Sequence, residues 1–505
     1  MKVRLMILKQ LLSSLGPAQV EGPLDREVAG LTCDSRRVTP GMVFVAIPGL
    51  NADGHSFIDS AIERGAAAVI YEHNGFVPHR ATRIKVADTR AALALAAAAY
   101  YQHPGARLEL AGITGTNGKT AVAFMLKAMF EAAGRRAGLL SSVRHEIGER
   151  VIPAQRTTPE APEVQQMLAG MVRAGCGAAI LEVSSHALAQ SRVAGLEFDV
   201  AVLTNLTEDH LDYHRSMEAY YGCKKRLFTS LRPGAKAGRA VVNVDDPYGA
   251  RLARELSAQT PLTYGLGQEA QLRATRLQLG RQGARMVIEG AGLAFECRLP
   301  LIGRHNLYNA LAAVGAASLL AVPASAMQAA LNSMAPVPGR LEPIDQGQPF
   351  GVYVDYAHTA EALRHALTTL REVCAGRLLL VFGCGGGRDT GKRPAMGRVA
   401  AELADLTVIT SDNPRREPPA QIAAQIEAGY HAVRPEAYRV ELDRPRAIGV
   451  AIRHAHPGDV VLIAGKGHET FQEFQETIVP FDDRLCAREA LTNLGHARPR
   501  PNHAL

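Results

Sequence analysis

The stretch at residues 108–120, LELAGITGTNGKT, places the strongest constraint on how this 505-residue chain can fold. An apolar run leads into the turn GTNGKT, and a helical pattern follows directly and ends at Gly134. A strand, a glycine-rich turn and a helix in that order point backbone N–H groups at one spot, where the helix N-terminus attracts anions. Lys119 can neutralise phosphate oxygens there, and the Thr120 hydroxyl can bind Mg²⁺. The stretch therefore predicts a nucleotide-phosphate site rather than a flexible turn, although Ile113 stands where the longer phosphate-loop pattern has glycine.

The composition narrows the class of protein further. With 47% hydrophobic and 21% charged residues, the chain is expected to form two to four globular domains. No uncharged apolar run reaches the roughly 18 residues that span a bilayer, and Lys9 interrupts the N-terminal run, so we expect neither membrane insertion nor a signal peptide. Seven scattered cysteines without a C-x-x-C pair favour the reducing cytoplasm. The net charge of +7 fits an anionic ligand, but the basic residues are dispersed, so we expect no nucleic acid. The expected partners are small molecules, and the expected state is a monomer.

The apolar patterns divide the chain into three segments. Residues 1–104 indicate a small mixed α/β domain. Residues 105–337 alternate apolar runs with helical stretches, which predicts a mostly parallel sheet with helices on both faces, and residues 338–505 repeat this pattern as a Rossmann-like, doubly wound domain. Strands are expected at 41–49, 66–72, 108–114, 177–184, 198–205, 239–245, 350–357, 377–384, 404–411 and 459–467. Helices are expected at 89–101, 121–134, 162–174, 217–231 and 303–321.

Acidic and histidine residues follow the expected strands of the central segment. In open parallel sheets, ligands bind at the carboxyl ends of the strands. Glu182 ends one apolar run and His210 follows the next, so both can meet Thr120 at one edge of the sheet. These three residues predict a magnesium and phosphate site. His210 and His214 have the i, i+4 spacing of a zinc pair, but their acidic neighbours and the missing H-E-x-x-H pattern argue against zinc.

The helix expected at 217–231 carries a lysine inside its apolar stripe. Lys224 shares one helical face with the apolar residues Met217, Tyr220, Leu227, Phe228 and Leu231. Lys225 lies on the other side of this helix. Burial would favour the neutral amine of Lys224, which can act as a base or react with CO₂ to form a carbamate that binds Mg²⁺. The alternative is a lysine whose stem packs on the core while its ammonium reaches solvent.

Charged residues also follow two strands of the last segment. The sequence DNPR at 412–415 follows one strand, and KGHE at 466–469 follows another. Arg388 and Arg415 can hold a carboxylate bidentately, and Glu469 can pair with an ammonium, which together suit an amino acid or a diamino acid. The alternative is a surface turn at Asn413-Pro414. The glycine-rich run at 383–388 ends in Arg388 where the dinucleotide pattern has glycine, so NAD or FAD is not expected.

Together these motifs resemble the Mur ligase family over essentially the whole chain. The resemblance is carried by GITGTNGKT, QRTTPE at 155–160, LEVSSHAL, TNLTEDHLDYH, GRHNLYNALAA, PGRLE at 338–342, VDYAHTAEAL, DNPR and GKGHE. It implies three domains that bind, in turn, a UDP-muramyl substrate, ATP and an incoming amino acid. The implied activity is ATP- and Mg²⁺-dependent ligation of meso-2,6-diaminopimelate to the D-glutamate γ-carboxylate of a UDP-muramyl dipeptide, through an acyl phosphate and with two Mg²⁺ ions, in cytoplasmic peptidoglycan precursor synthesis.

The resemblance also implies roles for individual residues. The expected ATP-binding residues are Thr114, Gly115, Thr116, Asn117, Gly118, Lys119, Thr120, His305, Asn306, Asn309, Arg340 and Asp355. Those for the UDP-muramyl substrate are Cys33, Ser35, Leu50, Asn51, Ala52, Thr157, Thr158, Ser184, Gln190 and Arg192. Those for diaminopimelate are Arg388, Asp412, Asn413, Pro414, Arg415, Gly465 and Glu469. The expected catalytic residues are Lys119, Glu182, His210 and Lys224, and the expected metal ligands are Thr120, Glu182, His210 and Lys224 as its carbamate.

Two positions depart from the family pattern. Ala360 stands where relatives usually have proline, and Cys33 stands where they often have leucine. Relatives that add L-lysine replace the arginine of DNPR, so Arg415 favours diaminopimelate. A folylpolyglutamate synthetase-like ligase remains an alternative function, although such a ligase normally lacks a first domain of this kind. A phosphate-loop NTPase that acts on nucleic acid and a pure binding module are further alternatives.

Overall fold

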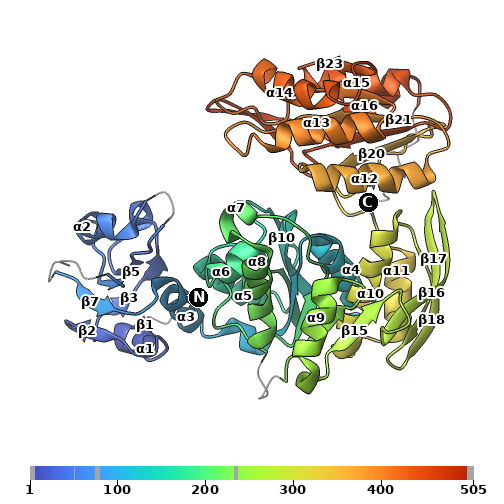
Figure 1. Cartoon of the computed structure of the whole chain (residues 1–505). Coiled ribbons are helices and arrows are strands. Elements are labelled where there is room, and N and C mark those ends of the chain that lie inside the picture. The colour runs from blue at the N-terminus through green and yellow to red at the C-terminus, as the bar shows by residue number, and fades with distance from the viewer. Residues whose placement is uncertain (1–5, 50–51, 74–79, 232–236, 497–505) are drawn as a thin grey trace, which may run out of the picture. The chain divides into compact units, whose positions relative to one another are not determined.

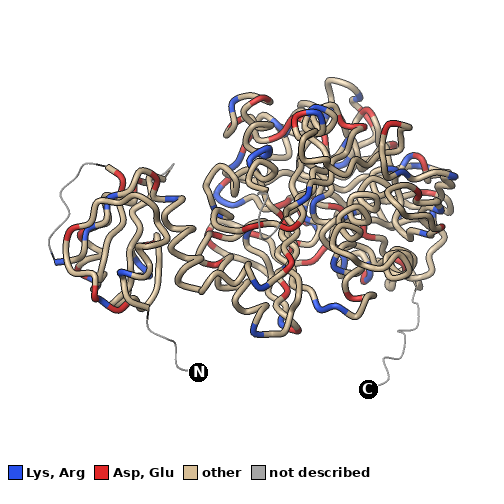
Figure 2. Tube along the Cα trace, turned by 90° about the horizontal axis from the view of Figure 1, so that it is seen from below, with Lys and Arg blue, Asp and Glu red and all other residues tan. Residues whose placement is uncertain are grey.

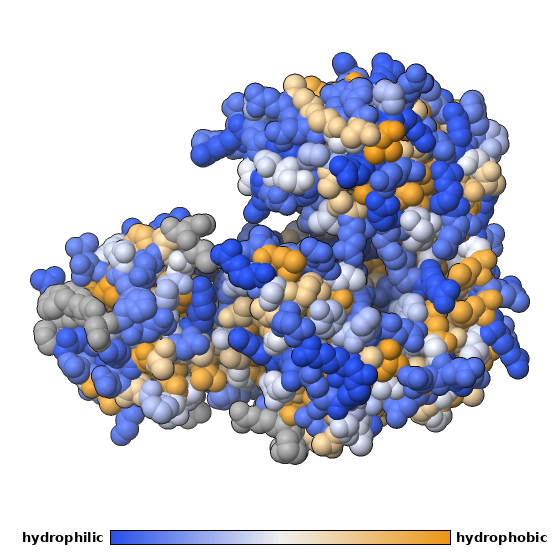
Figure 3. All heavy atoms as spheres, viewed as in Figure 1, coloured by the Kyte–Doolittle hydropathy of each residue, from blue (hydrophilic) through white to orange (hydrophobic). Residues whose placement is uncertain are grey.

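The computed structural model describes residues 6–49, 52–73, 80–231 and 237–496 (Figure 1). The chain forms two compact units. Residues up to 275 with 287–297 and 308–331 make up the first, and residues 276–286, 298–307 and 332 onward make up the second. Lys and Arg are interspersed with Asp and Glu along the trace (Figure 2), and most of the face seen in Figure 3 is hydrophilic. No helix in the described ranges is long and apolar enough to cross a membrane.

A five-stranded sheet forms the N-terminal part of the first unit. Its order is β2-β7-β6-β5-β4, in which β4 to β7 run parallel and β2 runs antiparallel to β7. The strands of this part are β1 Met6–Ile7, β2 Gln19–Glu21, β3 Glu27–Val28, β4 Gly30–Thr32, β5 Met42–Val45, β6 Ala68–Tyr71 and β7 Thr82–Lys85. The helices are α1 Leu8–Leu12, α2 Ile58–Glu63 and α3 Thr89–Tyr100. The strands predicted at 41–49 and 66–72 and the helix predicted at 89–101 are confirmed.

The central sheet has the order β11-β10-β9-β12-β8-β13-β14-β15-β16-β17-β18. The neighbours from β9 to β16 pair in parallel, as predicted, and the β10–β11 hairpin adds an antiparallel edge. The strands are β8 Glu109–Thr114, β9 Ala137–Leu140, β10 Arg144–Ile147, β11 Arg150–Pro153, β12 Ala178–Glu182, β13 Val200–Leu203, β14 Arg239–Asn243, β15 Leu262–Gly265, β16 Leu272–Gly280, β17 Gly283–Gly290 and β18 Leu293–Leu299. Sequence reasoning missed the hairpin strands β10, β11 and β16 to β18.

Helices cover both faces of this sheet. They are α4 Lys119–Ala132, α5 Ala161–Arg173, α6 Ser185–Ala189, α7 Leu211–His214, α8 Met217–Thr229, α9 Pro247–Glu255, α10 Arg304–Leu319 and α11 Ala324–Asn332, with short 3₁₀ turns at Ser35–Arg37, Gly54–Phe57, Pro104–Arg107 and Ser257–Gln259. The core side chains of α5, α6, α8 and α9 pack with Ala240 and Val242 of β14. Val241, between them in the strand, faces Gly315 of α10 on the other side. Alternate residues of a strand point to opposite faces, so both faces are buried.

The order of the central strands decides where the side chains at their ends meet. β8 lies between β12 and β13 in the sheet, although both strands come after it in the chain. Helices α4 and α5 lie between β8 and β12 in the sequence, and α6 lies between β12 and β13. All three strands run in the same direction. The phosphate loop after β8 therefore lies between the ends of β12 and β13, where Glu182 and Asn205 are found.

The second unit contains a doubly wound sheet of order β19-β20-β24-β21-β22-β23, parallel except for β19. Its strands are β19 Glu342–Pro343, β20 Gly351–Asp355, β21 Leu378–Phe382, β22 Leu406–Ile409, β23 Tyr438–Val440 and β24 Val460–Ala464, with a separate hairpin of β25 Phe471–Phe474 and β26 Thr477–Pro480. The helices are α12 Ala360–Val373, α13 Lys392–Leu403, α14 Pro419–His431, α15 Arg444–His454 and α16 Asp483–Asn493. The parallel architecture predicted for this segment is confirmed.

The β21 strand shows how this sheet is covered. Leu378 and Leu380 pack with α12, α13 and α14, whereas Leu379 and Val381 pack with α15 and α16. The α12 helix begins at Ala360 after Thr359, whose hydroxyl accepts a hydrogen bond from Ala362 N at 3.2 Å. This N-cap starts the helix at the position where the family pattern has proline.

A buried ion pair joins the last helix to two strand ends of this sheet. Arg444 and Asp483 have fully buried side chains, and Nε and Nη2 of the arginine donate to the two carboxylate oxygens at 2.7 Å each. Nη1 donates to the carbonyl of Ser411 at 3.2 Å, and Nη2 also donates to that of Ala464 at 2.9 Å. The guanidinium thus fixes the positions at which β22 and β24 lead into DNPR and KGHE.

Removing one partner of this pair should destabilise the second unit strongly. We expect Asp483→Ala to lower the free energy of unfolding by about 3–5 kcal/mol, because it leaves a buried guanidinium without its counter-charge. Chemical denaturation followed by circular dichroism measures the change. The exposed Glu436→Ala serves as the control and should stay within about 0.5 kcal/mol of the unaltered protein. Equal stability of both variants would contradict the assigned importance of the pair.

Candidate active site

The phosphate loop between β8 and α4 has a backbone that requires glycine at two positions. Gly115 and Gly118 have φ of 146° and 86°, values that residues with a Cβ rarely adopt. A Cβ on Gly115 would lie 1.9 Å from Thr204 Oγ1, and one on Gly118 would lie 2.3 Å from Asn309 Oδ1. The loop therefore fits tightly between the end of β13 and helix α10.

The N-terminus of α4 opens directly from this loop. The N-cap residue is Gly118, which has no side chain to cap the helix, so the first N–H groups can donate to an anion. Asn205 holds the loop in front of it, since its backbone and side-chain oxygens accept from Thr116 N and Asn117 N at 2.9 Å each. Lys119 Nζ crosses the loop and donates to the carbonyls of Gly115 and Thr116 at 2.9 and 2.7 Å. A phosphate bound here would meet Lys119 and the helix N-terminus together.

Glu182 lies beside the loop at the end of β12 and is fully buried. One carboxylate oxygen, Oε2, accepts from the Thr120 hydroxyl at 3.1 Å and from the Ser142 hydroxyl at 3.0 Å. The other, Oε1, accepts from Ser142 N at 2.8 Å. The structure thus brings together the hydroxyl oxygen of Thr120 and the carboxylate oxygens of Glu182. Oxygen atoms are the ligands that Mg²⁺ prefers.

Lys224 of α8 reaches the same loop from inside the protein. It is 2% exposed, and Nζ donates to the Gly115 carbonyl at 2.7 Å. Burial holds the pKa of Lys224 well below its usual value, and the charge of Lys119 lowers this pKa further. Lys225 instead has a side chain that is 35% exposed and pairs with Glu255 at 2.9 Å. The prediction that Lys224 rather than Lys225 lies on the buried face is confirmed.

Aromatic and histidine rings gather beside these residues. His210 lies just before α7 with a side chain that is 47% exposed, and its ring centre is 4.9 Å from that of His186 and 6.4 Å from that of Tyr220. Burial lowers the pKa of His210, although the charge of Asp209 acts in the opposite direction. Burial also lowers the pKa of His186 to about 4. Neutral imidazoles of this kind can serve as metal ligands at pH 7.

The residues expected to grip the muramyl dipeptide form a hydrogen-bonded group behind Glu182. Thr158 Oγ1 donates to the Glu182 carbonyl at 2.8 Å and accepts from Ser184 N at 3.1 Å. Arg192 donates to the Thr158 carbonyl at 2.9 Å and to Gln190 Oε1 at 2.7 Å. Thr157 joins the group because its hydroxyl oxygen lies within hydrogen-bonding distance, 3.0 Å, of that of Ser142. The structure therefore brings all five residues expected to bind the muramyl dipeptide to the end of β12, namely Thr157, Thr158, Ser184, Gln190 and Arg192.

The remaining expected ATP-binding residues divide between the two units. Asn309 belongs to the first unit and faces Gly118 of the loop. In the second unit, His305 is partly exposed with its ring centre 4.9 Å from that of His365, and desolvation of its ring lowers its pKa to about 3. Asn306 Nδ2 donates to the Ile302 carbonyl at 2.8 Å.

Arg340 and Asp355 also belong to the second unit. The guanidinium of Arg340 lies 5.0 Å from the centre of the Tyr356 ring. Asp355 accepts from Leu341 N at 2.7 Å and from Ala357 N at 2.8 Å, and burial raises its pKa.

In the N-terminal sheet, the residues expected at the uridine end lie in two loops. Cys33 is partly buried, which raises the pKa of its thiol, and Ser35 begins a 3₁₀ turn. The Ala52 carbonyl accepts from Gly49 N at 3.1 Å. Leu50 and Asn51 lie outside the described residues.

The second unit holds the residues expected to bind the amino acid. Lys466 is fully buried, and its Nζ donates to Asn413 Oδ1 at 2.9 Å and to Glu469 Oε2 at 2.8 Å. Asn413 Nδ2 also donates to Glu469 Oε2, at 3.0 Å. Arg415 donates from Nε to Glu473 Oε2 at 2.8 Å. The ends of β22 and β24 are thus joined by a network of charged hydrogen bonds.

Four further residues of this set surround the network. A Cβ on Gly465 would lie 2.6 Å from Asp412 Oδ2, and one on Gly386 would lie 1.9 Å from the Pro414 carbonyl. Burial raises the pKa of Tyr356, and the negative charges of Glu469 and Asp412 raise it further. The positive charges of Arg340 and Arg388 lower this pKa. Arg388 is exposed, in contrast to the buried Asp412.

Sequence reasoning missed three residues that the structure adds to these sites. Ser142 follows the end of β9 and binds Glu182, so the strand-end rule that found Glu182 could have found it. Lys466 belongs to the GKGHE motif, but no periodicity indicates its complete burial. Glu473 lies in the β25–β26 hairpin, and no sequence signal places it beside Arg415.

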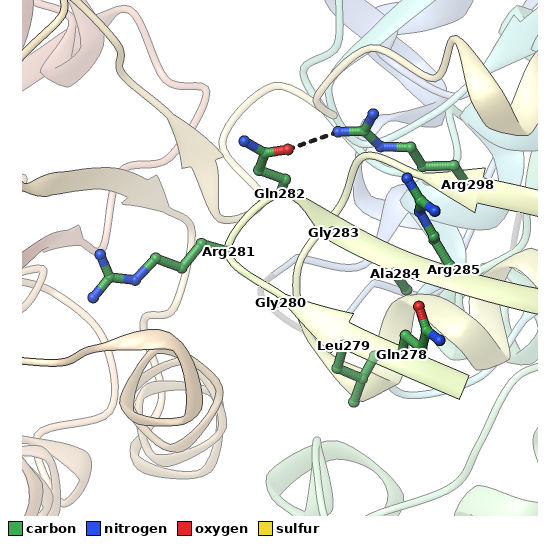
Figure 4. Close-up of a pocket in the computed structure, with 9 residues that line it drawn as sticks. All are labelled: Gln278, Leu279, Gly280, Arg281, Gln282, Gly283, Ala284, Arg285 and Arg298. Atoms are coloured by element: carbon green, nitrogen blue, oxygen red, sulfur yellow. Dashed lines mark hydrogen bonds between the residues drawn. The ribbon is translucent and has the colours of Figure 1, made fainter. Parts of the chain in front are cut away.

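A separate hollow lies at the tip of the β16–β17 hairpin (Figure 4). Its volume is about 300 Å³, and it is lined by residues 278–285 and Arg298. Arg298 donates to Gln282 Oε1 at 2.9 Å, whereas Arg281 points away and donates to the Val373 carbonyl at 2.8 Å. The expected site residues do not line this hollow.

Comparison with known proteins assigns the whole chain to one family. Residues 27–101 match the model of the Mur ligase family catalytic domain, residues 113–317 that of the Mur ligase middle domain, and residues 339–467 that of the Mur ligase glutamate ligase domain. The chain belongs to the Mur ligase family, and it is an ATP-dependent ligase that forms amide bonds. Its three-domain, mostly parallel α/β architecture agrees with the predicted fold class.

Two curated relatives and one solved structure that match nearly the whole chain carry the same name. A UDP-N-acetylmuramoyl-L-alanyl-D-glutamate–2,6-diaminopimelate ligase of Geobacter metallireducens is 43% identical over 95% of this chain and 97% of its own length. A ligase of the same name from Synechococcus elongatus is 45% identical over 96% of this chain and 99% of its own. A solved structure of a ligase with this name matches 98% of this chain and all of its own with a TM-score of 0.69 and 30% identity.

The position of Lys224 allows a direct test of its role. We expect Lys224→Ala to lower kcat about 100-fold or more, because it removes a buried amine from the phosphate loop. Binding of ATP, measured by equilibrium titration, should change by less than about threefold. Lys225→Ala, which alters the neighbouring exposed lysine, is the matched control and should change kcat less than about twofold. The reverse ranking of the two variants would refute the role assigned to Lys224.

Proposed function

We propose that the chain joins meso-2,6-diaminopimelate to the γ-carboxylate of UDP-N-acetylmuramoyl-L-alanyl-D-glutamate with hydrolysis of ATP to ADP and phosphate. The observation that carries the proposal is the pairing of a phosphate loop with Thr120, Glu182 and Lys224 in one unit and of DNPR with Lys466 and Glu469 in the other. The names of relatives that match nearly the whole chain support the same substrate set. The activity would serve peptidoglycan precursor synthesis in the cytoplasm, and thereby cell shape and cell division.

The division of labour follows the three predicted segments. Residues 1–104 bind the UDP end of the substrate through Cys33, Ser35 and residues 50–52. Residues 105–337 bind ATP and the dipeptide carboxylate, and residues 338–505 bind the amino acid. We propose that one chain is sufficient for the reaction, so that a monomer is the active form.

The reaction takes place in two steps in this proposal. The γ-carboxylate of D-glutamate attacks the γ-phosphorus of ATP, and ADP leaves, so that an acyl phosphate is formed. The amino group of diaminopimelate then attacks the acyl carbon, and phosphate leaves as the amide forms and the amine loses its proton. All reacting groups of the first step are anionic, so neutralisation of charge dominates the catalysis. Lys119 supplies one positive charge at the phosphate loop.

The same loop has the donors for Mg²⁺ and for a carbamate. The Thr120 hydroxyl and the buried carboxylate of Glu182 supply oxygen ligands, and His210 supplies a neutral nitrogen. Lys224 is buried and favours its neutral amine, which is the form that adds CO₂ and releases a proton to become a carbamate. Two Mg²⁺ ions held by these four residues would neutralise phosphate charge.

Two alternative functions predict different substrates. A folylpolyglutamate synthetase-like ligase would use glutamate and a folate, and would make no use of residues 1–104 as a UDP-binding part. A phosphate-loop NTPase would hydrolyse ATP in response to nucleic acid and remain indifferent to the UDP-muramyl dipeptide. Phosphate release measured with each substrate set separates the three functions.

Arg415 should decide the choice of amino acid. In a phosphate-release assay with ATP and the UDP-muramyl dipeptide, we expect strong turnover with meso-diaminopimelate and little with L-lysine. Arg415→Ala should raise the KM for diaminopimelate roughly 10- to 100-fold, because a charge-assisted hydrogen bond to the ligand contributes about 1.5–3 kcal/mol.

The KM for ATP provides the internal control for this variant, and it should change by less than about twofold. Exposed Arg416, the next residue, supplies a second control as Arg416→Ala. An unchanged KM for diaminopimelate in Arg415→Ala would remove this residue from the pocket. Equal turnover of L-lysine and diaminopimelate by the unaltered protein would refute the proposed specificity.

A further inference from the structure

The β25–β26 hairpin binds the DNPR loop through hydrogen bonds. Gln472 Nε2 donates to the Asp412 carbonyl at 2.9 Å, and Glu473 N donates to Asn413 Oδ1 at 3.1 Å. The backbone of Arg415 is held twice, since its N–H donates to the Glu473 carbonyl at 3.0 Å and its carbonyl accepts from Gln475 N at 2.7 Å. This pairing maintains Arg415 at a φ of 51°. The hairpin therefore sets the position of the arginine that the proposed function assigns to the substrate.

The side chains of Arg415 and Glu473 form an open ion pair. Arg415 Nε donates to Glu473 Oε2 at 2.8 Å, and Nη1 donates to the Gly386 carbonyl at 2.8 Å. The two side chains are 25% and 32% exposed, so a ligand can reach both. Among the residues that the structure describes, neither Arg415 Nη2 nor Glu473 Oε1 has a hydrogen-bond partner. One donor group and one acceptor oxygen thus remain available side by side.

The other acidic side chains of the pocket are engaged differently. Glu469 Oε2 accepts from Lys466 at 2.8 Å and from Asn413 at 3.0 Å. Asp412 is 8% exposed and packs against Gly465, and its charge, with that of Glu469, acts on the buried Arg444. Glu473 is therefore the acid that lies directly against Arg415 and remains open to solvent.

We propose that Glu473 is a specificity-determining residue that binds the distal ammonium of diaminopimelate, while Arg415 binds the distal carboxylate. The inference rests on the proposed function. The distal end of diaminopimelate carries an ammonium and a carboxylate on one carbon. A carboxylate and a guanidinium whose nitrogen and oxygen atoms are 2.8 Å apart present the complementary pair of charges. The pocket would then recognise a zwitterion rather than a single charge.

Three amino acids that differ only at the distal end test this inference. meso-Diaminopimelate carries both distal charges, L-2-aminopimelate carries the carboxylate alone, and L-lysine carries the ammonium alone. Each is measured as a substrate, or as a competitive inhibitor where turnover is too slow, with saturating ATP and UDP-muramyl dipeptide. The variant is Glu473→Gln, which keeps the size and the hydrogen-bonding shape of the side chain but removes its charge.

We expect Glu473→Gln to raise the KM for meso-diaminopimelate about tenfold and to change the constant for L-2-aminopimelate less than twofold. The preference for diaminopimelate over aminopimelate should therefore fall by about the same factor of ten. The KM for ATP should be unchanged. Glu476→Gln is the matched control, since Glu476 lies in the turn of the same hairpin and pairs with Arg416 at 3.5 Å, and both side chains are more than 80% exposed.

Two results would overturn the inference. If Glu473→Gln weakened diaminopimelate and aminopimelate equally, Glu473 would act only by holding Arg415. If it changed neither constant while thermal unfolding remained as in the unaltered protein, Glu473 would not contact the substrate. Failure of the proposed function is distinguishable, because the unaltered protein would then form no product with diaminopimelate at all.

Discussion

The convergence of two lysines on one carbonyl oxygen organises the centre of this protein. Lys119 and Lys224 both donate to the Gly115 carbonyl, at 2.9 and 2.7 Å, although they come from helices about 100 residues apart in the chain. Two ammonium groups so close together repel each other, and the buried one is the one that loses its proton more easily. The loop thus brings together two amines, of which the buried Lys224 has the lowered pKa. In the proposed function, this difference would let Lys119 bind phosphate while Lys224 forms the carbamate.

The convergence depends on backbone geometry that tolerates few substitutions. Gly115 lies so close to Thr204 that a Cβ would overlap its hydroxyl oxygen. The close approach places β13 and the loop in contact, and Tyr220 of α8 lies 3.3 Å from the Thr116 hydroxyl. Glu182 enters from the other neighbouring strand. Side chains and carbonyls from the ends of β8, β12 and β13 and from helices α4 and α8 therefore meet around the phosphate loop.

Much of the fold could be predicted from the sequence because its signals are local. Apolar runs in β8, β12, β13 and β21 are short, and the helix periodicity of α8 separates Lys224 from Lys225 correctly. The position of Glu182 at a strand end was also predictable from the rule for parallel sheets. The residues missed, Lys466 and Glu473, contact partners more than 50 positions earlier in the chain. Such contacts depend on how a hairpin docks on a strand end, and neither periodicity nor composition carries that information.

The buried pair of Arg444 and Asp483 has a consequence for the order in which parts of the protein fold during synthesis. Arg444 donates to the carbonyls of Ser411 and Ala464, and its charge is compensated by Asp483 of α16. Burial of Arg444 is therefore unfavourable until α16 has been synthesised. Domains that emerge first from the ribosome fold first. The phosphate loop of the first unit can therefore fold before the ends of β22 and β24 are fixed by α16. In the proposed function, a nascent chain would form the loop that activates the carboxylate before it forms the pocket that selects the amine.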